Sequence, residues 1–393
     1  MSRICIKFGR CASLLAALIG GSKVTAMSLK TILLVGLFVA AFGLLRRDAP
    51  RAQDCSVTVQ PGQTIRSAIE QASVGAVICL SAGTWEENLL INKGLTLRGA
   101  GPDQTLIQGV KVDEPIIRIE DFSDAMVTIE GLRMTQHHLK GWGRGMDIFS
   151  TTGTVVIRNV QIVKTNRDGL QVMGRVSVNL IDSQISDSGD TYPHLLFDEG
   201  GISVGGSAQL TITNSRVLDN KSYGLVAYDS ATVKLTDSRV SGNGGEKFVL
   251  RGVGLIAADR ATVELENSLI SANEFHGLSV EDLAVVRVRR STIEGNGLGF
   301  FRCSRVNTIC NGVVIQGQAV VELFDSQILN NLDWGLAAVR KECGYEEDQF
   351  TGQVFFYGQN TITGNNKSGN HTAQGNPGKH PFTNLPPGNV CLP

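Results

Sequence analysis

The sequence has little charge and no surplus of either sign. Of its 393 residues, 36 are Lys or Arg and 37 are Asp or Glu, which gives a formal net charge of -1. Because no basic surplus is present to neutralise phosphates, nucleic acid is not expected as a partner. Charged residues amount to 19% of the chain, below the ~25% of an average soluble protein, whereas glycine is frequent with 45 residues. Repeated tight turns account for both deviations.

The sequence also lacks any Cys-x-x-Cys pair, so a zinc or redox site has little support and no cofactor is expected. Of the eight cysteines, Cys5 and Cys11 lie in an N-terminal leader. The other six are an even number in a chain expected to be exported, which favours disulfides and leaves their connectivity open. The pairs we expect are Cys303–Cys310 within one loop, Cys343–Cys391 pinning the tail and Cys55–Cys79 closing the N-terminal cap.

The leader contains one apolar run, from Thr31 to Leu45, which Lys30 precedes and Arg46 follows. Its fifteen residues suit a signal peptide better than a membrane span, which needs roughly 20. An uncleaved single-pass anchor that attaches the protein to a membrane stays open, as does a second start at Met27. Either alternative predicts an exported protein of the cell envelope. We therefore divide the chain into a leader and linker (1–54), a repeat region (55–365) and a tail rich in Gly, Pro and Asn (366–393).

One short pattern recurs through the repeat region: aliphatic, polar, aliphatic, variable, Asp/Asn/Arg, Ser, variable, aliphatic. It is found at Val178–Ile185, Leu210–Val217, Val233–Val240, Val263–Ile270, Val286–Ile293 and Val321–Ile328. Its shortest spacing, 23 residues, is too short for a repeat that contains helices. The period-two alternation and the many β-branched residues predict strands, which would coil into a parallel β-helix. A leucine-rich horseshoe is the rival, but Val and Ile share the inward positions with Leu.

Aligning the repeats produces rows of equivalent residues. Three rows are aliphatic and begin at Val155, Ile157 and Ile162, which predicts an interior. A row of serines marks the turns. A further row consists of asparagines, and we predict that it forms an internal ladder whose amides bond to the turn backbone of the next coil. Its members are Asn220, Asn243, Asn273, Asn296, Asn331 and Asn365. A metal or catalytic role for this row has much less support.

A short helix is predicted before the repeats, from Thr64 to Ala72, because apolar residues recur there at helical spacing behind a threonine. It would cover the first coil of the solenoid, where unpaired backbone is exposed. Strands are expected at Ala76–Leu80, Leu89–Asn92 and Leu95–Arg98.

The repeat is interrupted at one corner, on every second coil, by longer loops. Between them, four short coils place Asp168, Tyr223, His276 and Trp334 directly before a glycine. The loops add Trp142, Arg144, His194, Asp198, Glu199, Arg251 and Arg302. Aromatic faces beside carboxylates and arginines suit a polysaccharide or cell-envelope glycan, which offers C–H faces and hydroxyls. Tolerated surface insertion is the alternative interpretation of these loops.

Two stretches carry a family resemblance: Thr64 to Ile69 followed by Gly83 to Asn88, and Leu95 to Gly99, together with the repeats. With them the chain resembles the right-handed parallel β-helix, or pectin-lyase-like, superfamily. The resemblance implies an all-β fold, a right-handed parallel β-helix solenoid with a short N-terminal capping helix. It leaves the function open, because this fold hosts enzymes and binding proteins alike.

Among enzymes of that fold, polygalacturonases carry aspartates and a histidine on successive coils. Asp168 matches their first aspartate and Glu199 one further acid, which makes these two residues the candidates for catalysis. Gly200 and Tyr223 stand where another aspartate and the histidine belong. The leading hypothesis is therefore an exported protein that binds a polysaccharide along the looped face. A glycan-cleaving enzyme and a structural or adhesive rod are the alternatives.

Overall fold

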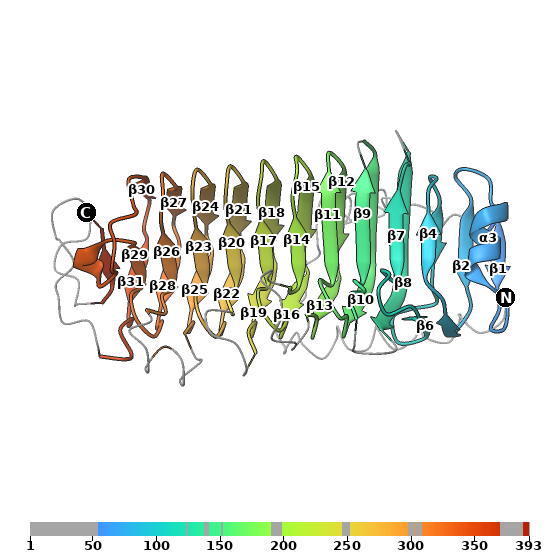
Figure 1. Ribbon diagram of the computed structural model, residues 1–393, viewed down its shortest axis with the longest axis horizontal. Helices are drawn as coiled ribbons and strands as arrows, with labels where there is room; N and C mark the ends of the chain where they lie inside the picture. The colour runs from blue at the N-terminus through green and yellow to red at the C-terminus, as the bar shows by residue number, and fades with distance from the viewer. Residues whose placement is uncertain are drawn as a thin grey trace, which may run out of the picture. The chain divides into compact units, whose positions relative to one another are not determined.

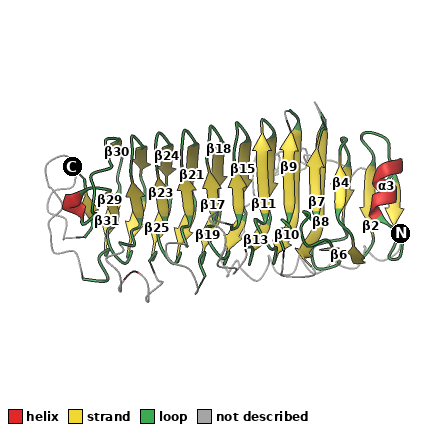
Figure 2. Cartoon of the chain, in the orientation of Figure 1, coloured by secondary structure: helices red, strands yellow, loops and turns green. Residues whose placement is uncertain are grey.

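The structure is a computed structural model that describes residues 54–122, 125–136, 141–150, 152–189, 199–245, 252–297, 303, 309–369 and 388–392. Strands dominate this part of the chain, and helices lie only near its two ends (Figure 2). Coil follows coil along the long axis of the picture, from the N-terminal to the C-terminal end (Figure 1). All strand pairs between successive coils are parallel, as the repeat predicts.

Two ladders of strands form one 21-stranded sheet, which we call sheet A. The first ladder consists of β1 (Val57–Val59), β2 (Val77–Leu80), β5 (Thr96–Arg98), β8 (Met126–Gln136), β10 (Thr154–Val163), β12 (Ser177–Ile181), β15 (Gln209–Thr213), β18 (Thr232–Thr236), β21 (Thr262–Glu266), β24 (Val285–Arg289), β27 (Val320–Phe324) and β30 (Gln353–Tyr357). The second ladder consists of β3 (Gly83–Glu86), β6 (Thr105–Gly109), β13 (Gln184–Ser186), β16 (Arg216–Leu218), β19 (Arg239–Ser241), β22 (Leu269–Ser271), β25 (Thr292–Glu294), β28 (Gln327–Leu329) and β31 (Thr361–Thr363). The long strands β8 and β10 belong to both ladders and join them.

The third side of each coil is an 11-stranded sheet, which we call sheet B. Its strands are β4 (Leu89–Ile91), β7 (Ile117–Glu120), β9 (Met146–Ser150), β11 (Leu170–Gly174), β14 (Ile202–Val204), β17 (Leu225–Ala227), β20 (Leu255–Ala257), β23 (Leu278–Val280), β26 (Val313–Ile315), β29 (Leu336–Ala338) and β32 (Val390–Cys391). The sheet therefore starts at β4 and takes its last strand, β32, from the tail rich in Gly, Pro and Asn.

The three predicted aliphatic rows form the interior. Val155, Ile157 and Ile162, which begin the rows, have no exposed surface, and the later members are equally buried. Their outward neighbours are polar, because successive side chains of a strand point to opposite faces. The sequence alternation thus sets the core directly.

The turn between the two ladders explains the Asp/Asn position of the repeat. Asp182, Asn214 and Asp237 have φ near +50°, the left-handed region that asparagine and aspartate tolerate best. Arg290 adopts the same conformation with φ +47°. The next residue is the serine of the repeat. In the Ser183 and Ser215 pair, the Ser183 N–H donates to Ser215 Oγ at 3.0 Å on the following coil.

The predicted asparagine ladder is present and is bonded more tightly than we expected. The oxygen of Asn243 accepts both the backbone N–H (3.1 Å) and the side-chain amide (2.9 Å) of Asn220. The same pattern links Asn243 to Asn273 and continues through the later members. The ladder ends on Asn389, which receives the side-chain amide of Asn365 at 2.9 Å. Amides therefore bond to amides as well as to turn backbone.

The N-terminal end carries the predicted helix, α3 (Ile65–Gln71). Its cap differs from the expected one, because the Thr64 hydroxyl makes no capping bond to the backbone. Instead the carboxylate of Glu87 accepts the N–H groups of Ile65 (2.7 Å) and Arg66 (3.1 Å). A residue 22 positions away in the chain thus performs the function of an N-cap.

Three disulfides are present, and they are the three expected pairs: Cys55–Cys79, Cys303–Cys310 and Cys343–Cys391. The last of them fixes β32 beside a short 3-10 helix, η1 (Lys341–Cys343). Disulfides are typical of proteins that occupy oxidising, exported compartments. The predicted leader, with its apolar run, lies outside the described residues. Within residues 54–392, as far as they are described, no helix is long and apolar enough to cross a membrane.

Candidate functional site

The residues two positions before the strands of sheet B, from β9 to β29, form one row. Backbone hydrogen bonds between coils place them in the order Arg144, Asp168, Gly200, Tyr223, Val253, His276, Asn311 and Trp334. Arg144 and Asp168 therefore lie on adjacent coils, and Tyr223 lies two coils beyond Asp168. His194, Asp198, Arg251 and Arg302, which we also expected at this corner, lie outside the described residues.

Asp168 is the centre of a hydrogen-bond network and is only 3% exposed. Its Oδ1 accepts the Tyr223 hydroxyl at 2.7 Å and the Gly200 N–H at 3.1 Å. Its Oδ2 accepts Arg144 Nε at 3.3 Å. Tyr223 passes close to Gly200 on its way to Asp168: a Cβ on Gly200 would lie 2.3 Å from the Tyr223 carbonyl oxygen and 2.8 Å from its ring. Three groups from three coils thus hold one carboxylate.

A second ion pair lies beside the first. Arg167 Nε is 2.5 Å from Glu199 Oε1, and Glu199 is 5% exposed. The guanidinium of Arg167 also lies 5.6 Å from the ring of Trp142, within the range of a cation–π contact. Both carboxylates proposed as catalytic are therefore covered and held by arginines. In this arrangement they position their neighbours and do not present an oxygen to solvent.

The outward side of sheet B continues this cluster. On β7, β9 and β11 the outward residues are Arg118, Asp147 and Gln171, which lie side by side in register. Asp147 Oδ2 is 3.9 Å from both Arg118 Nη2 and Arg144 Nη1. Burial raises the pKa of Asp147 above its ordinary value, as does the nearby charge of Asp168, while the two arginines oppose the shift. This row links the Asp168 network to the strands at the N-terminal end.

Two exposed aromatic rings and one partly buried tyrosine flank the cluster. Phe149 on β9 is 57% exposed and Trp142 is 47% exposed. Tyr228 follows β17, and its hydroxyl contacts the Met173 sulfur at 3.1 Å. Burial raises the pKa of Tyr228, an effect that the hydroxyl of Ser203 opposes. The exposed rings have the faces that stacking on a ligand requires.

Three of these residues were missed in the sequence: Arg118, Asp147 and Tyr228. Each occupies or follows an ordinary outward strand position, where a polar residue is expected in any parallel β-helix. Only their register across strands, Arg118 to Asp147 to Gln171, distinguishes them. This register can be recognised only when the pairing between strands that are distant in the sequence is known.

The other members of the predicted row are buried and lie in the C-terminal coils. His276 Nδ1 accepts the Asn311 N–H at 3.0 Å, and burial lowers the pKa of His276 to about 3, against the opposing charge of Asp333. The Trp334 indole donates to the Cys343 carbonyl at 3.0 Å. Tyr223, His276 and Trp334 therefore offer covered side chains where we had expected exposed aromatic faces.

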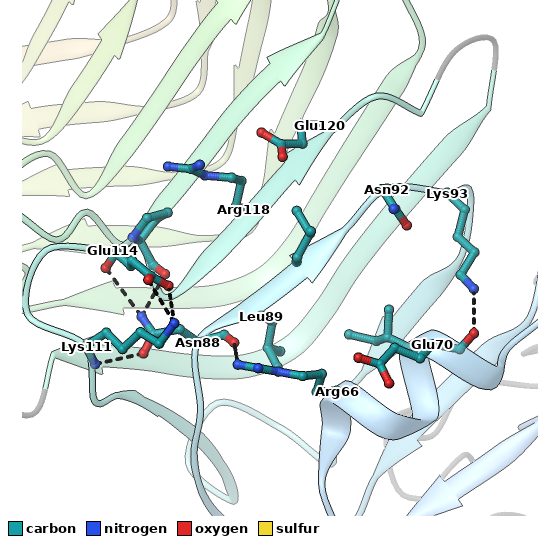
Figure 3. A pocket seen from close by; sticks show the side chains of 13 residues that line it. Arg66, Glu70, Asn88, Leu89, Asn92, Lys93, Lys111, Glu114, Arg118 and Glu120 are labelled. Carbon is teal, nitrogen blue, oxygen red and sulfur yellow. Dashed lines mark hydrogen bonds and ion pairs between the residues drawn. The ribbon is translucent and has the colours of Figure 1, made fainter.

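A pocket of about 560 Å³ lies where sheet B begins (Figure 3). Its base is formed by outward residues of β4 and β7, including Leu90 and Arg118. Arg66 and Glu70 of α3 line it on one side, and the segment around Glu114 lines it on another. Among the described residues, no group of three His, Cys, Asp or Glu side chains is placed to hold a metal ion.

Comparisons with known proteins agree with the fold. The family model "Right handed beta helix region" matches residues 115–252. A search of curated proteins found no match. Among solved structures, pectate lyase Pel9A is similar with a TM-score of 0.49 and 13% identity, covering 72% of this chain and 80% of that one.

Two further solved structures are similar at the same level. The A-module of the Azotobacter vinelandii mannuronan C-5 epimerase AlgE4 has a TM-score of 0.46 and 15% identity, over 76% of this chain and 90% of that one. The alginate lyase from Paenibacillus sp. str. FPU-7 has a TM-score of 0.48 and 13% identity, over 78% and 100%. Because the identities are 13–15% and the TM-scores lie below 0.5, a function has to be argued from this chain's own residues.

Proposed function

Since the chain is a member of the right-handed parallel β-helix superfamily, we propose that it binds a polysaccharide along the outward side of β4, β7, β9, β11 and β14. We call this surface the binding face. The observation that carries the proposal is the uninterrupted row of Arg118, Asp147 and Gln171 beside the exposed ring of Phe149.

The charge of this row is confined to one half of sheet B. After Ser203 on β14, the outward residues in register are Val226, Ile256, Ser279, Val314 and Ala337. A row needed only for stacking coils has no reason to change from charged to apolar. The change therefore favours a ligand at the N-terminal half.

A linear glycan fits this surface better than a compact ligand does. Parallel strands lie about 4.8 Å apart, so a polymer laid across them meets a new set of side chains at each coil. Phe149 and Trp142 can stack on C–H faces of sugar rings, while Arg118, Asp147 and Gln171 can bond hydroxyls. The ion pairs behind the face, Arg144–Asp168 and Arg167–Glu199, hold these groups in place.

A purely structural rod explains this cluster less well. Covering the charges of Asp168 and Glu199 costs desolvation free energy, which a rod could avoid with apolar residues. In the C-terminal half the corner holds one buried carboxylate, Asp333, and the outward row of the sheet beside it carries no charge. The cluster is therefore best explained by a ligand.

Glycan cleavage is a second candidate, and Asp147 favours it. Its pKa is raised and it shares Arg144 with a second carboxylate, Asp168. A perturbed carboxyl group beside another one is a common feature of acid–base sites. This candidate predicts reducing-end release from a polysaccharide panel, and loss of that release in Asp147→Asn. No release from any substrate of the panel would leave binding as the function.

Binding is tested by applying the full-length protein to a glycan array and then measuring affinity for the glycans retained. Phe149→Ala removes an exposed ring without disturbing the core, and we expect it to weaken binding about tenfold. Phe355→Ala is the matched control, since Phe355 is an exposed aromatic residue on β30 of sheet A. Retention of no glycan at all, or equal losses in both variants, would contradict the proposal.

A further inference from the structure

We infer that the binding face takes the free end of a polysaccharide chain, because the face stops at the pocket beside α3. This inference rests on the proposed function and adds the part of the polymer that is recognised. Sheet B begins with β4, and α3 lies against β4 where the next strand would be. A polymer lying across the strands therefore meets α3 after β4.

Helix α3 is a firm wall because both of its ends are bonded to the coil behind it. Glu87 accepts the first N–H groups of the helix, as described above. At the other end, Lys93 Nζ donates to the carbonyls of Glu70 (3.1 Å) and Ala72 (2.9 Å). Ile65 and Ile69 anchor the inner side of the helix in the core. Moving α3 aside would break all of these contacts.

The second wall is fixed through Asn88, which is buried. Its Oδ1 accepts the N–H groups of Val110 (3.0 Å) and Lys111 (2.9 Å), and its Nδ2 donates to the Pro115 carbonyl at 2.8 Å. Arg66 Nη2 donates to the Asn88 carbonyl at 2.9 Å and so connects this wall to α3. The two walls are therefore braced against each other, and Figure 3 shows them on either side of Leu89.

The interior of the pocket suits a sugar. Leu90 is 47% exposed at its base, and Arg118 and Glu120 on β7 stand next to it. Groups of both charges around a small apolar base match a hydroxyl-rich ring better than an alkyl chain. The volume of about 560 Å³ lies within the range of small-ligand pockets, roughly 300 to 1,000 Å³.

The pocket is continuous with the binding face. Arg118 pairs with Asp147, and Glu120 with Phe149, in the register of β7 and β9. The remainder of a chain whose end lies in the pocket would thus pass directly onto the binding face. The pocket and the face form one site, which ends at its N-terminal side.

The test uses oligosaccharides from disaccharide to decasaccharide and the parent polysaccharides of four series: cello-, xylo-, galacturonate and mannuronate. Calorimetry with the full-length protein measures the number of proteins bound per chain. We expect one protein per chain at every length. Leu90→Trp, which fills the base of the pocket, should weaken binding at least tenfold. Ile256→Trp places the same ring on the outward side of β20, beyond the binding face, and should leave the affinity unchanged.

The possible outcomes separate the two proposals. Several proteins on each long chain would show recognition within the chain and overturn the inference, while leaving the binding face intact. Equal affinity of Leu90→Trp and the unmodified protein would also overturn it. Absence of binding to all four series and to the glycan array would instead contradict the proposed function itself.

Discussion

The Tyr223 hydroxyl donates a 2.7 Å hydrogen bond to Asp168 Oδ1 from two coils away, across the gap left by Gly200. This bond brings together Asp168, Gly200 and Tyr223, which are far apart in the sequence. It also explains a departure from the polygalacturonase-like pattern, in which Gly200 and Tyr223 replace an acid and a histidine. A glycine at position 200 leaves room for both the backbone and the ring of Tyr223.

Removing that hydroxyl should destabilise the protein measurably. Tyr223→Phe leaves a covered carboxylate oxygen with one donor fewer, and hydrogen bonds to charged groups contribute about 1.5–3 kcal/mol. We expect a loss of that size in the free energy of unfolding measured with urea. The exposed Tyr357→Phe is the control and should change stability by less than about 0.5 kcal/mol. Equal losses of unfolding free energy in the two variants would show that the bond to Asp168 contributes no more than an exposed hydroxyl does.

Gly200→Ala should cost more than Tyr223→Phe. The added Cβ would lie 2.3 Å from the Tyr223 carbonyl oxygen and 2.8 Å from its ring, so the backbone of the coil must shift as well as the ring. Gly295→Ala is not a suitable comparison, because Gly295 has φ +60° and would be strained for another reason. Gly200→Ala in the Tyr223→Phe background keeps the ring and backbone contacts and removes only the hydroxyl, so the cost should stay if it is steric. A double variant as stable as Tyr223→Phe alone would contradict this account.

Asp147 should show a conflict between stability and binding. The pKa of Asp147 is raised in the folded state, so folding disfavours its ionised form. The free energy of unfolding therefore decreases as pH rises from the pKa of the unfolded state, near 3.9, through the higher pKa of the folded state. Asp147→Asn removes this penalty, and we expect an equal or higher Tm at neutral pH together with weaker glycan binding. Thermal unfolding of both proteins across this pH range checks the sign. If the Tm of Asp147→Asn fell further below the Tm of the unmodified protein as pH rises, the expected sign of the pH dependence would be wrong.

His276 predicts the opposite pH dependence. The unfolded chain binds a proton at this residue below about pH 6.5, whereas the folded protein does so only near pH 3. Stability contributed by the neutral form is therefore lost progressively as pH falls from about 6.5 towards 3. In His276→Asn the amide oxygen can still accept the Asn311 N–H, and its unfolding free energy should depend less on pH in this window. Parallel curves for both proteins would refute the assignment.

The sequence predicts the interior of this protein better than its outer surfaces. The inward residues, such as Val155 and Ile157, follow from an alternation within one short segment, and so does the Asn/Asp position at each turn. Contacts between coils do not follow from such local rules. Glu87 replaces Thr64 as the cap of α3, and Tyr223 points at Asp168, because of neighbours that lie more than twenty residues away.

The candidate site shows the same division. The corner row that holds Asp168 follows from the sequence, since breaks in a repeat are visible there. Asp147 was not found, because an outward polar residue on a strand is unremarkable until its partners Arg118 and Arg144 are known. Exposure is equally non-local: Trp334 and Tyr223 are aromatic residues at a predicted surface, yet the coils beside them cover both.

The asparagine ladder should be most sensitive in its middle. Asn296→Ala removes an acceptor of two bonds from Asn273 and the donor to Asn331, so several buried groups lose their partner. Leaving such groups unsatisfied costs about 1–3 kcal/mol each, so we expect a loss of at least about 2 kcal/mol in unfolding free energy. Asn220→Ala, at the N-terminal end of the ladder, should cost less, since among the described residues Asn220 Oδ1 accepts one bond, from the Ser188 N–H. The exposed Gln327→Ala on β28 is the control, with an expected change below about 0.5 kcal/mol. Equal losses at Asn296 and Asn220 would show that the ladder acts as separate pairs, because a continuous chain of bonds makes its interior members more costly to remove than its ends.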